Sequence, residues 1–323
     1  MREADFTLKI EHSGDVKLLF ITDMQIIDAN QRRFPERLGG SSLTNWVPEK
    51  NEYNIYRFVR ELVERSKPDL ILITGDIIYG EFDDSGSSFT EYAAFMDSFK
   101  IPWAPVYGNH DNESRKGAEW QNEMFINSEY CLFAKGDVFG NGNYTIDIEQ
   151  GGETIRRICM VDSNGCHGAG VSQGWRPDQL EWLEGCGKDN CPSFVCMHIP
   201  SKDFEDAAIA AGYVKEYDRA DDWAKYDLDK NPVSPDADFG VKRENFDSSV
   251  QPTLMPILKK IEADGVFAGH YHLVNTSIKY EGVRFTLVTK TGLYDYHNGD
   301  IVGGTLATLS GKSFAVEHLY CKI

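Results

Sequence analysis

Five short segments of the sequence carry side chains that can bind a metal ion, at spacings that repeat along the chain. They are Asp23-Met24-Gln25, Gly75-Asp76, Gly108-Asn109-His110-Asp111, Val195-Cys196-Met197-His198 and Gly269-His270-Tyr271-His272. Aspartate, asparagine and histidine without thiolates suit ions such as Fe, Mn or Zn and argue against a structural zinc knuckle. The number of these side chains is sufficient for two ions. Two ions about 3.5 to 4 Å apart can share a carboxylate, bind a phosphate oxygen and activate a bridging water for attack at neutral pH.

Each group has an ordinary structural explanation when it is taken alone. Gly-Asp is a common turn, His-Ile-Pro can end a strand, and a lone histidine is more often a core residue than a ligand. The pair His270 and His272 is more informative, because residues i and i+2 of an extended segment face the same side. The five groups in series therefore indicate a metal site.

The elements that would position these groups follow from hydrophobic patterning. Short apolar runs, typical of strands buried on both faces, occupy residues 16–21, 70–73, 103–108, 158–161, 194–197 and 266–268. Helical patterns predict helices over residues 55–63, 90–99, 177–183 and 253–261. In open α/β sheets the carboxyl ends of the strands line the ligand crevice. We therefore expect an α/β fold in which the five groups converge.

The end of the chain and one long polar stretch follow a different pattern. Residues 283–288, 303–309 and 313–319 alternate with turns, which predicts consecutive antiparallel strands. Residues 201–250 are polar and acidic, and they contain Asn231-Pro232 and Ser234-Pro235. This composition predicts an insertion that either caps the site or lies on the surface without contacting substrate. We expect one domain over residues 1–323.

Composition and charge narrow the class of partner. The 51 acidic residues exceed the 33 basic ones, and the net charge of −18 disfavours a nucleic acid duplex or an anionic membrane. The apolar run at 16–21 is too short for a signal segment or a membrane-spanning helix. Seven cysteines without a Cys-x-x-Cys pair argue against a complete disulfide framework. We expect a cytoplasmic protein; the sequence does not determine its oligomeric state.

The order and spacing of the five groups, over residues 16–272, closely resemble those of the calcineurin-like metallophosphoesterases. Within this family, residues 101–111 and 75–79 look most similar to the purple-acid-phosphatase-related branch that includes the Dcr2-type phosphatases. The resemblance implies a four-layer αββα sandwich. It also implies a binuclear centre of two divalent or trivalent transition-metal ions, Fe, Mn or Zn.

The resemblance assigns a role to each candidate ligand. It implies that Asp76 bridges the two ions, that Asp23 and His272 bind one ion, and that the other is bound by Asn109, His198 and His270. A hydroxide that bridges the ions would attack a phosphate monoester in line. His110 would be the general acid that protonates the leaving group. The adjacent Asp111 would orient His110 and raise its pKa, or would only cap a turn.

Two positions depart from the commonest pattern of the family, and a third is open. Gln25 stands where most members have a histidine ligand, so the first ion is expected to be loosely held or differently chosen, or Gln25 contacts only a metal-bound water. Tyr79 stands where purple acid phosphatases use a tyrosinate to bind ferric iron, although packing is the alternative. His167 lies in a glycine-rich loop and either touches substrate or is exposed.

Three functions are compatible with these residues. The first is a phosphomonoesterase that acts on a small phosphorylated molecule or a phosphoprotein. The second is a phosphodiesterase that acts on a cyclic nucleotide or another diester, with the same metal ligands. The third is a non-catalytic scaffold, for which Gln25 is the only support.

Overall fold

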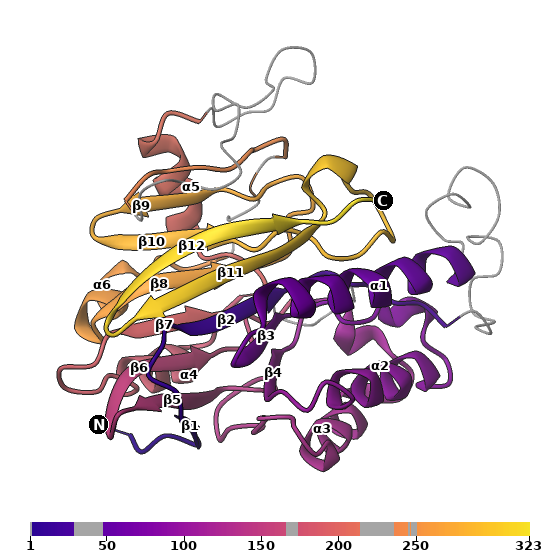
Figure 1. Ribbon diagram of the computed structural model, residues 1–323, viewed down its shortest axis with the longest axis horizontal. Coiled ribbons are helices and arrows are strands. Elements are labelled where there is room, and N and C mark those ends of the chain that lie inside the picture. Colours follow the sequence, from indigo (N-terminus) through magenta and orange to yellow (C-terminus); the bar gives the residue numbers. More distant parts are fainter. Residues whose placement is uncertain (1, 29–47, 166–173, 214–235, 245, 247–250) are drawn as a thin grey trace.

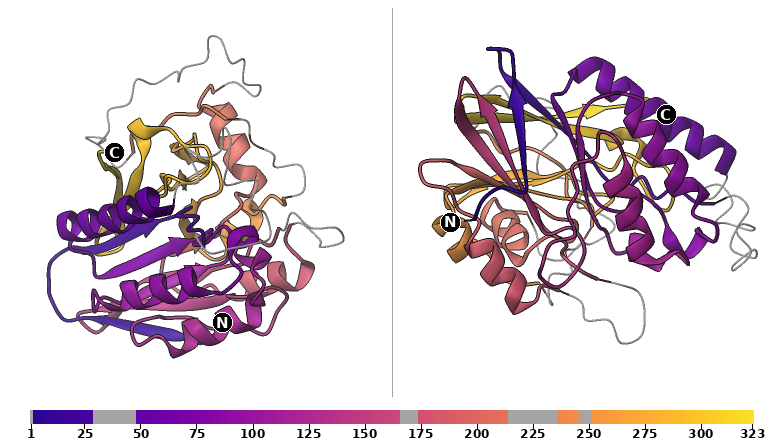
Figure 2. Two further views of the ribbon diagram at one scale, coloured as in Figure 1. Left: turned by 90° about the vertical axis from the view of Figure 1, so that its right-hand side faces the viewer. Right: turned by 90° about the horizontal axis from the view of Figure 1, so that it is seen from below.

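Two β-sheets pack face to face, and helices cover the outer face of each (Figures 1 and 2). The computed structural model describes residues 2–28, 48–165, 174–213, 236–244, 246 and 251–323. In Figure 2 the two sheets lie between one helical layer formed by α1, α2 and α3 and another formed by α4, α5 and α6. This is the four-layer α/β arrangement that the sequence predicted.

The larger sheet has the strand order β1-β5-β6-β7-β8-β10-β9. Its strands are β1 (Phe6–Ile10), β5 (Tyr144–Gln150), β6 (Glu153–Met160), β7 (Ser193–Cys196), β8 (Ala263–Ala268), β9 (Ser277–Tyr280) and β10 (Val283–Leu287). Strands β6, β7, β8 and β10 are parallel to one another, so their carboxyl ends lie at one edge.

The smaller sheet has the strand order β12-β11-β2-β3-β4. Its strands are β2 (Val16–Ile21), β3 (Leu70–Thr74), β4 (Trp103–Val106), β11 (Gly303–Ser310) and β12 (Ser313–Tyr320). Strands β2, β3 and β4 are parallel. Strands β11 and β12 form an antiparallel hairpin that adds to β2.

The helices are amphipathic and bury their apolar sides against the sheets. They are α1 (Pro48–Ser66), α2 (Ser87–Asp97), α3 (Gly117–Asn127), α4 (Pro177–Glu184), α5 (Lys202–Ala210) and α6 (Met255–Lys260). In α1, Ile55, Phe58, Val59 and Leu62 repeat at helical spacing and are fully buried. Helix α6 begins later than predicted because Pro256, which lacks an amide N–H, is tolerated only in the first turn.

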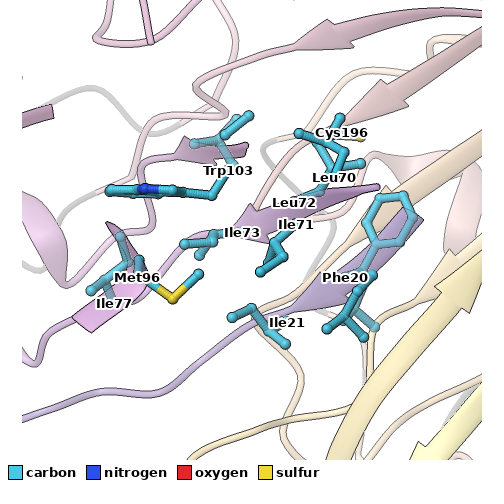
Figure 3. Close-up of a cluster of buried hydrophobic side chains, with 14 of the residues drawn as sticks. Phe20, Ile21, Leu70, Ile71, Leu72, Ile73, Ile77, Met96, Trp103 and Cys196 are labelled. Atoms are coloured by element: carbon cyan, nitrogen blue, oxygen red, sulfur yellow. The ribbon is translucent and has the colours of Figure 1, made fainter. Parts of the chain in front are cut away.

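The main core lies between the two sheets. Phe20 of β2 stacks on Phe267 of β8, with ring centroids 4.0 Å apart, and so joins one sheet to the other. Figure 3 shows Phe20 and Ile21 near the side chains of β3 in this cluster, with Cys196 of β7 close by. A second core fills the space between the larger sheet and α4, α5 and α6. Dense packing on both faces explains why the central strands are continuous apolar runs.

The prediction of consecutive antiparallel strands at the end of the chain was right for β11 and β12 and wrong for β10. Strand β10 belongs to the larger sheet, where it is parallel to β8 and antiparallel to β9. All five residues of β10 are buried, so the strand is an interior one and its alternation does not mark an exposed hairpin.

The polar stretch over residues 201–250 contributes to the core at both of its ends. Phe204 and Ala207 of α5 are buried under the larger sheet, and Phe239 pairs with Ser277 of β9. Residues near both ends of this stretch therefore pack with the rest of the domain. Its central part, residues 214–235, lies outside the described residues, so the prediction of an insertion or cap stays a prediction.

Two general properties agree with the composition. The helices of the described chain include none that is long and apolar enough to cross a membrane. The six cysteines within the described ranges are all free thiols.

A buried ion cluster joins β5 and β6, and its carboxylate should be a pH-dependent source of stability. Asp147 accepts hydrogen bonds from Arg157, at 2.7 and 3.0 Å, and from Lys188 at 2.7 Å. Burial alone would raise the pKa of Asp147, but these two cations outweigh it and lower that pKa. A lowered pKa in the folded state means that the stabilisation is complete above the unfolded pKa of about 3.9 and is lost as the pH falls below it.

We expect Asp147→Asn to lower the free energy of unfolding by about 2 kcal/mol at pH 7, because the cations lose a charged acceptor. The difference from the wild type should shrink as the pH falls below about 4. Urea unfolding at several pH values measures both effects. Asp137→Asn is the control, because Asp137 pairs with Arg2 but is 73% exposed and should contribute little. An Asp147→Asn defect that is independent of pH would contradict this account.

Candidate metal centre

The five predicted groups lie at the carboxyl ends of strands from both sheets. Asp23 follows β2, Asp76 follows β3 and Asn109 follows β4 in the smaller sheet, whereas His198 follows β7 and His270 follows β8 in the larger one. The backbone amide of Gly269 donates to the carbonyl of His198, which ties the ends of β7 and β8 together. The site therefore spans the junction of the two sheets.

Left-handed backbone turns aim several of these side chains into the junction. The φ angles of Asp23, Gln25, Asp76 and His270 are 51°, 50°, 51° and 76°. This conformation is unfavourable for residues other than glycine and persists only where surrounding contacts hold it, typically at functional sites. Here the amide of Asp23 donates to the carbonyl of Gly75, and the amide of Gln25 donates to the carbonyl of Asp76. The turns after β2 and β3 thus hold each other in place.

One cluster of donor atoms surrounds the side-chain oxygen of Asn109. Its Oδ1 lies 3.1 Å from Nε2 of His198 and 3.0 Å from Nδ1 of His270. The Nδ2 of Asn109 is buried and has no hydrogen-bond partner. Buried polar atoms nearly always have hydrogen-bond partners, so the unpartnered Nδ2 of Asn109 requires an explanation. Together with the position of Oδ1 between two imidazoles, it suggests that a ligand or an ion binds here.

A second cluster surrounds the two carboxylates. Oδ1 of Asp23 lies 3.2 Å from Nε2 of His272, and Oδ2 of Asp76 lies 3.4 Å from Nε2 of His198. Ligand atoms of Asp23, Asp76 and His198 all lie within 4.8 Å of one another. His198 is therefore common to both clusters, and Asp76 lies between them.

Backbone carbonyls fix the tautomers of two histidines in the form that a metal ligand needs. Nδ1 of His198 lies 2.8 Å from the carbonyl oxygen of Thr74, and Nδ1 of His272 lies 3.0 Å from that of Tyr296. A carbonyl only accepts, so in each ring Nδ1 carries the hydrogen. In the neutral ring, Nε2 then presents its lone pair to the carboxylates.

The carboxylates are buried but held in the ionised form. Burial would raise the pKa of Asp23, but the hydrogen bond from His272 and the charge of His198 lower it. Burial opposes ionisation of Asp76 as well, and the charges of His198 and His110 lower its pKa. Burial would lower the pKa of His198, yet Asp76 and Asp23 raise it to about 9. Burial lowers the pKa of His270 to about 3, so this imidazole stays neutral.

These donors fit two cations. Two ionised carboxylates, an amide oxygen and three imidazoles converge in a buried pocket that has a surplus of lone pairs and one orphaned amide. Oxygen and imidazole donors in this mixture suit Fe, Mn or Zn. Asp76, positioned between the two clusters, is the group that both ions would share.

His110 lies beside the clusters and is hydrogen-bonded to Glu113, a residue that no motif in the sequence indicated. Its Nδ1 lies 2.8 Å from Oε2 of Glu113, and the ring of Tyr79 stacks on it at 3.9 Å between centroids. Glu113 and Asp76 raise the pKa of His110 against the effect of burial. The spacing of three residues between His110 and Glu113 was the available signal, since such residues face each other across a helical turn.

The prediction that Asp111 orients His110 is wrong. The two carboxylate oxygens of Asp111 accept hydrogen bonds from the backbone amides of Gly108, at 2.8 Å, and Ile78, at 3.1 Å. Asp111 therefore has the turn-capping role that the sequence left as the alternative. Burial and the charge of Asp76 raise its pKa to about 7.

A buried lysine that the sequence did not identify reaches the cluster around the two carboxylates. Lys290 is 2% exposed, and its Nζ donates to the carbonyl oxygen of Asp23 at 3.0 Å and to Oε1 of Gln25 at 2.7 Å. Burial lowers the pKa of Lys290. Lys290 lies just after β10, far from every motif in the sequence, so no local pattern pointed to it.

Further residues lie at the rim of the site, and one predicted position lies beyond the described chain. The ring of Tyr296 packs on His272 at 4.3 Å between centroids. A cavity of about 400 Å³, lined by Asn112, Phe139, Asp162 and Gly165 among others, adjoins the cluster around Asn109. A β-carbon on Gly165 would lie only 3.6 Å from that of Asn109. His167 lies outside the described residues, and the ligand role of Tyr79 stays a prediction.

Comparison with known proteins agrees with this geometry. The model of the calcineurin-like phosphoesterase family matches residues 16–274, which contain all five groups. A solved dimetal phosphatase from Danio rerio superposes with a TM-score of 0.54 at 12% identity, over 95% of this chain and 96% of that chain. At this identity the likeness concerns the fold alone.

Two relatives represent the branch that the motifs suggested. A protein named probable inactive purple acid phosphatase 14, from Arabidopsis thaliana, is 22% identical over 90% of this chain and 73% of its own length. Phosphatase DCR2 of Saccharomyces cerevisiae is 35% identical over 33% of this chain and 20% of its own length. The similarity therefore covers most of the first relative and only a small part of the second.

The close approach of Gly108 to Asp76 leads to a prediction about the site. A β-carbon at Gly108 would lie 2.1 Å from Oδ1 and 2.3 Å from the backbone nitrogen of Asp76. We expect Gly108→Ala to displace Asp76, to lower the free energy of unfolding by about 1 to 3 kcal/mol and to reduce the metal retained after purification. Thermal unfolding and elemental mass spectrometry measure these effects.

Gly14→Ala is the matched control, because its nearest neighbour would be 3.7 Å away. A Gly108→Ala protein with normal stability and metal content would contradict the proposed packing constraint.

Proposed function

Because the chain belongs to the calcineurin-like phosphoesterases, a family of metal-dependent phosphoric ester hydrolases, we propose that it hydrolyses a phosphate monoester at a centre of two metal ions. The observation that carries this proposal is the convergence of donor atoms from five strand ends, with Asp76 between two clusters. Asp23 and His272 would hold one ion, and the other would be held by Asn109, His198 and His270. Asp76 would bind both.

When bound, the two ions would polarise the phosphoryl group and lower the pKa of a water placed for in-line attack. The contribution of the chain is to position the reacting groups. The buried carboxylates and the imidazoles, which bind an ion in their neutral form, make a rigid set of ligands, because carbonyl groups fix the rings of His198 and His272. The native ions are proposed to be Fe, Mn or Zn.

His110 is proposed as the general acid that protonates the departing oxygen. Since Nδ1 of His110 bonds to Glu113, the proton available to substrate is the one on Nε2. Glu113 is proposed as a positioning residue that holds the ring and favours its protonated form. Stacking on Tyr79 restricts rotation of the imidazole.

The space beside the site favours a monoester that has one organic group. The cavity of about 400 Å³ lies beside Asn109 and includes Asn112, which follows His110 by two residues. A leaving group in this cavity would have its ester oxygen near His110. The cavity is lined by both polar and apolar groups, which is compatible with a small phosphorylated molecule or a side chain of a phosphoprotein.

The free thiols of the described cysteines support a reducing, cytoplasmic compartment.

A non-catalytic scaffold is the second candidate, because Gln25 stands where most family members have a histidine ligand and three relatives are named probable inactive purple acid phosphatases. The other predicted ligands and His110 are all present, and short contacts link them around Asp76 and Asn109. A protein released from catalytic constraint has no reason to retain buried carboxylates, which are costly without a compensating charge. We therefore place the enzyme ahead of the scaffold.

The first test addresses the shared carboxylate. We expect Asp76→Asn to lower the metal content from two ions per chain to at most one, because a neutral amide does not offset two cations. Elemental mass spectrometry on protein purified without chelator measures this. Asp162→Asn is the matched control, a buried carboxylate that follows β6 and is bonded to backbone amides. An unchanged metal content in Asp76→Asn would remove Asp76 as the shared ligand.

The second test addresses the acid. His110→Ala should lower kcat on an alkyl phosphate by roughly 10²-fold to 10⁴-fold and should have a much smaller effect on a nitrophenyl phosphate, which needs no protonation. Equal losses on both substrates would remove His110 as the acid.

Glu113 helps to raise the pKa of His110, so Glu113→Gln should make the rate fall at a lower pH on the basic side of the pH–rate profile. Glu123→Gln, a change at an exposed residue of α3, should leave the profile unchanged.

A further inference from the structure

Besides their different ligands, the two proposed metal positions differ in the contact between Lys290 and Gln25, which lies beside the Asp23 position. Lys290 reaches Gln25 from the segment that follows β10, and both side chains are buried. Nζ of Lys290 lies 2.7 Å from Oε1 of Gln25, and Nε2 of Gln25 lies 3.3 Å from Oδ2 of Asp76. Each end of the Gln25 amide therefore has its own partner.

Hydrogen-bond chemistry determines which end of the amide faces the metal ligands. An ammonium group has donors and no acceptor, so Lys290 selects the oxygen of Gln25. A carboxylate has acceptors and no donor, so Asp76 selects the nitrogen. The two choices agree, and a reversed amide would place nitrogen against nitrogen and oxygen against oxygen. The group that Gln25 presents to Asp76 is an NH₂, which has no lone pair for a metal ion.

The backbone reinforces this arrangement. Gln25 has a φ of 50°, and its amide is bonded to the carbonyl of Asp76, so the start of the side chain is fixed. Lys290 is also bonded through Nζ to the carbonyl oxygen of Asp23. Its own carbonyl accepts a hydrogen bond from the amide of Gly303 at the start of β11. The lysine is thus held from both ends and cannot move without disturbing the turn after β2.

We propose, on the basis of the function proposed above, that the Lys290–Gln25 pair makes the two metal positions unequal and so makes hydrolysis depend on metal supply. The position at Asn109, His198 and His270 fills first. Residue 25 supplies no ligand to the position at Asp23 and His272. Lys290 lies on the far side of the Gln25 amide from Asp76 and adds a positive charge near this position. It fills only at a higher concentration of the free divalent ion, and hydrolysis begins when it is filled.

The test is a titration of chelator-treated protein with Mn²⁺, in which the free ion is followed by its electron paramagnetic resonance signal. We expect two binding events per chain, with dissociation constants that differ by on the order of tenfold or more. His272→Ala should abolish only the weaker event. Two events of equal affinity in the wild type would overturn the proposal.

Two variants separate the role of the pair from a ligand role of Gln25. Lys290→Met removes the donor and the charge with similar side-chain volume, and it should tighten the weaker event by roughly tenfold and leave the tighter event unchanged. Lys188→Met is the control, because Nζ of Lys188 bonds Asp147 and Thr154 at the other end of β6. No change in the weaker event for Lys290→Met would overturn the proposal.

Gln25→Ala gives an answer even if Lys290→Met does not fold. If Gln25 were a ligand, its removal would weaken the second event by roughly tenfold or more. Because Gln25 presents an NH₂, we expect its removal to leave the weaker event unchanged or tighter. If Gln25→Ala binds the second ion less tightly than the wild type does, the proposal is overturned.

Metal binding is measured separately from turnover, so the two proposals can fail independently. Two unequal events in a protein without hydrolytic activity would support the inference and reject the proposed function. Activity with two equal events would do the opposite.

Discussion

Two carboxylates, Asp23 and Asp76, are buried at the junction of the two sheets, and the structure around them keeps both ionised. Each is at most 1% exposed. A buried carboxylate is costly unless it is paired or hydrogen-bonded, so the surrounding groups must supply donors. Thr22 and the amide of His270 donate to Asp23, while the amide of His110 donates to Asp76. Of these donors, the amide of His270 belongs to a residue with a left-handed backbone.

Because Asp23 and Asp76 are buried, the backbone also packs closely against their side chains. Gly108 and Gly269 lie so near the carboxylates that a β-carbon on Gly269 would be 2.1 Å from Oγ1 of Thr22 and 2.8 Å from Oδ2 of Asp23. Glycine at these positions is thus required by space and not by an unusual φ. Burial also strengthens the electrostatic interactions of the two carboxylates, because a low local dielectric constant screens charges less than water does.

The charge that balances the carboxylates is distributed unevenly between the two clusters. His198 contacts the Asn109 cluster and Asp76, so its imidazole serves both. On the other side, Lys290 supplies a donor to the turn that carries Asp23 and Gln25. The electrostatic surroundings of the two clusters therefore differ, and part of this difference comes from Lys290, a residue outside the motifs.

Local patterns in the sequence were sufficient for the central strands, the amphipathic helices and the choice of the six side chains that are proposed as metal ligands. The reason is that parallel strands buried on both faces are continuous apolar runs, and their carboxyl ends meet at one edge. Tertiary structure alone decided that β10 joins the larger sheet, that Glu113 and not Asp111 bonds His110, and that Lys290 reaches Gln25. Contacts of this kind depend on the packing of segments up to 265 residues apart and on which hydrogen-bond partners are already taken. The chain's local sequence thus determined which chemistry the site has, and long-range packing determined how its charges and protons are arranged.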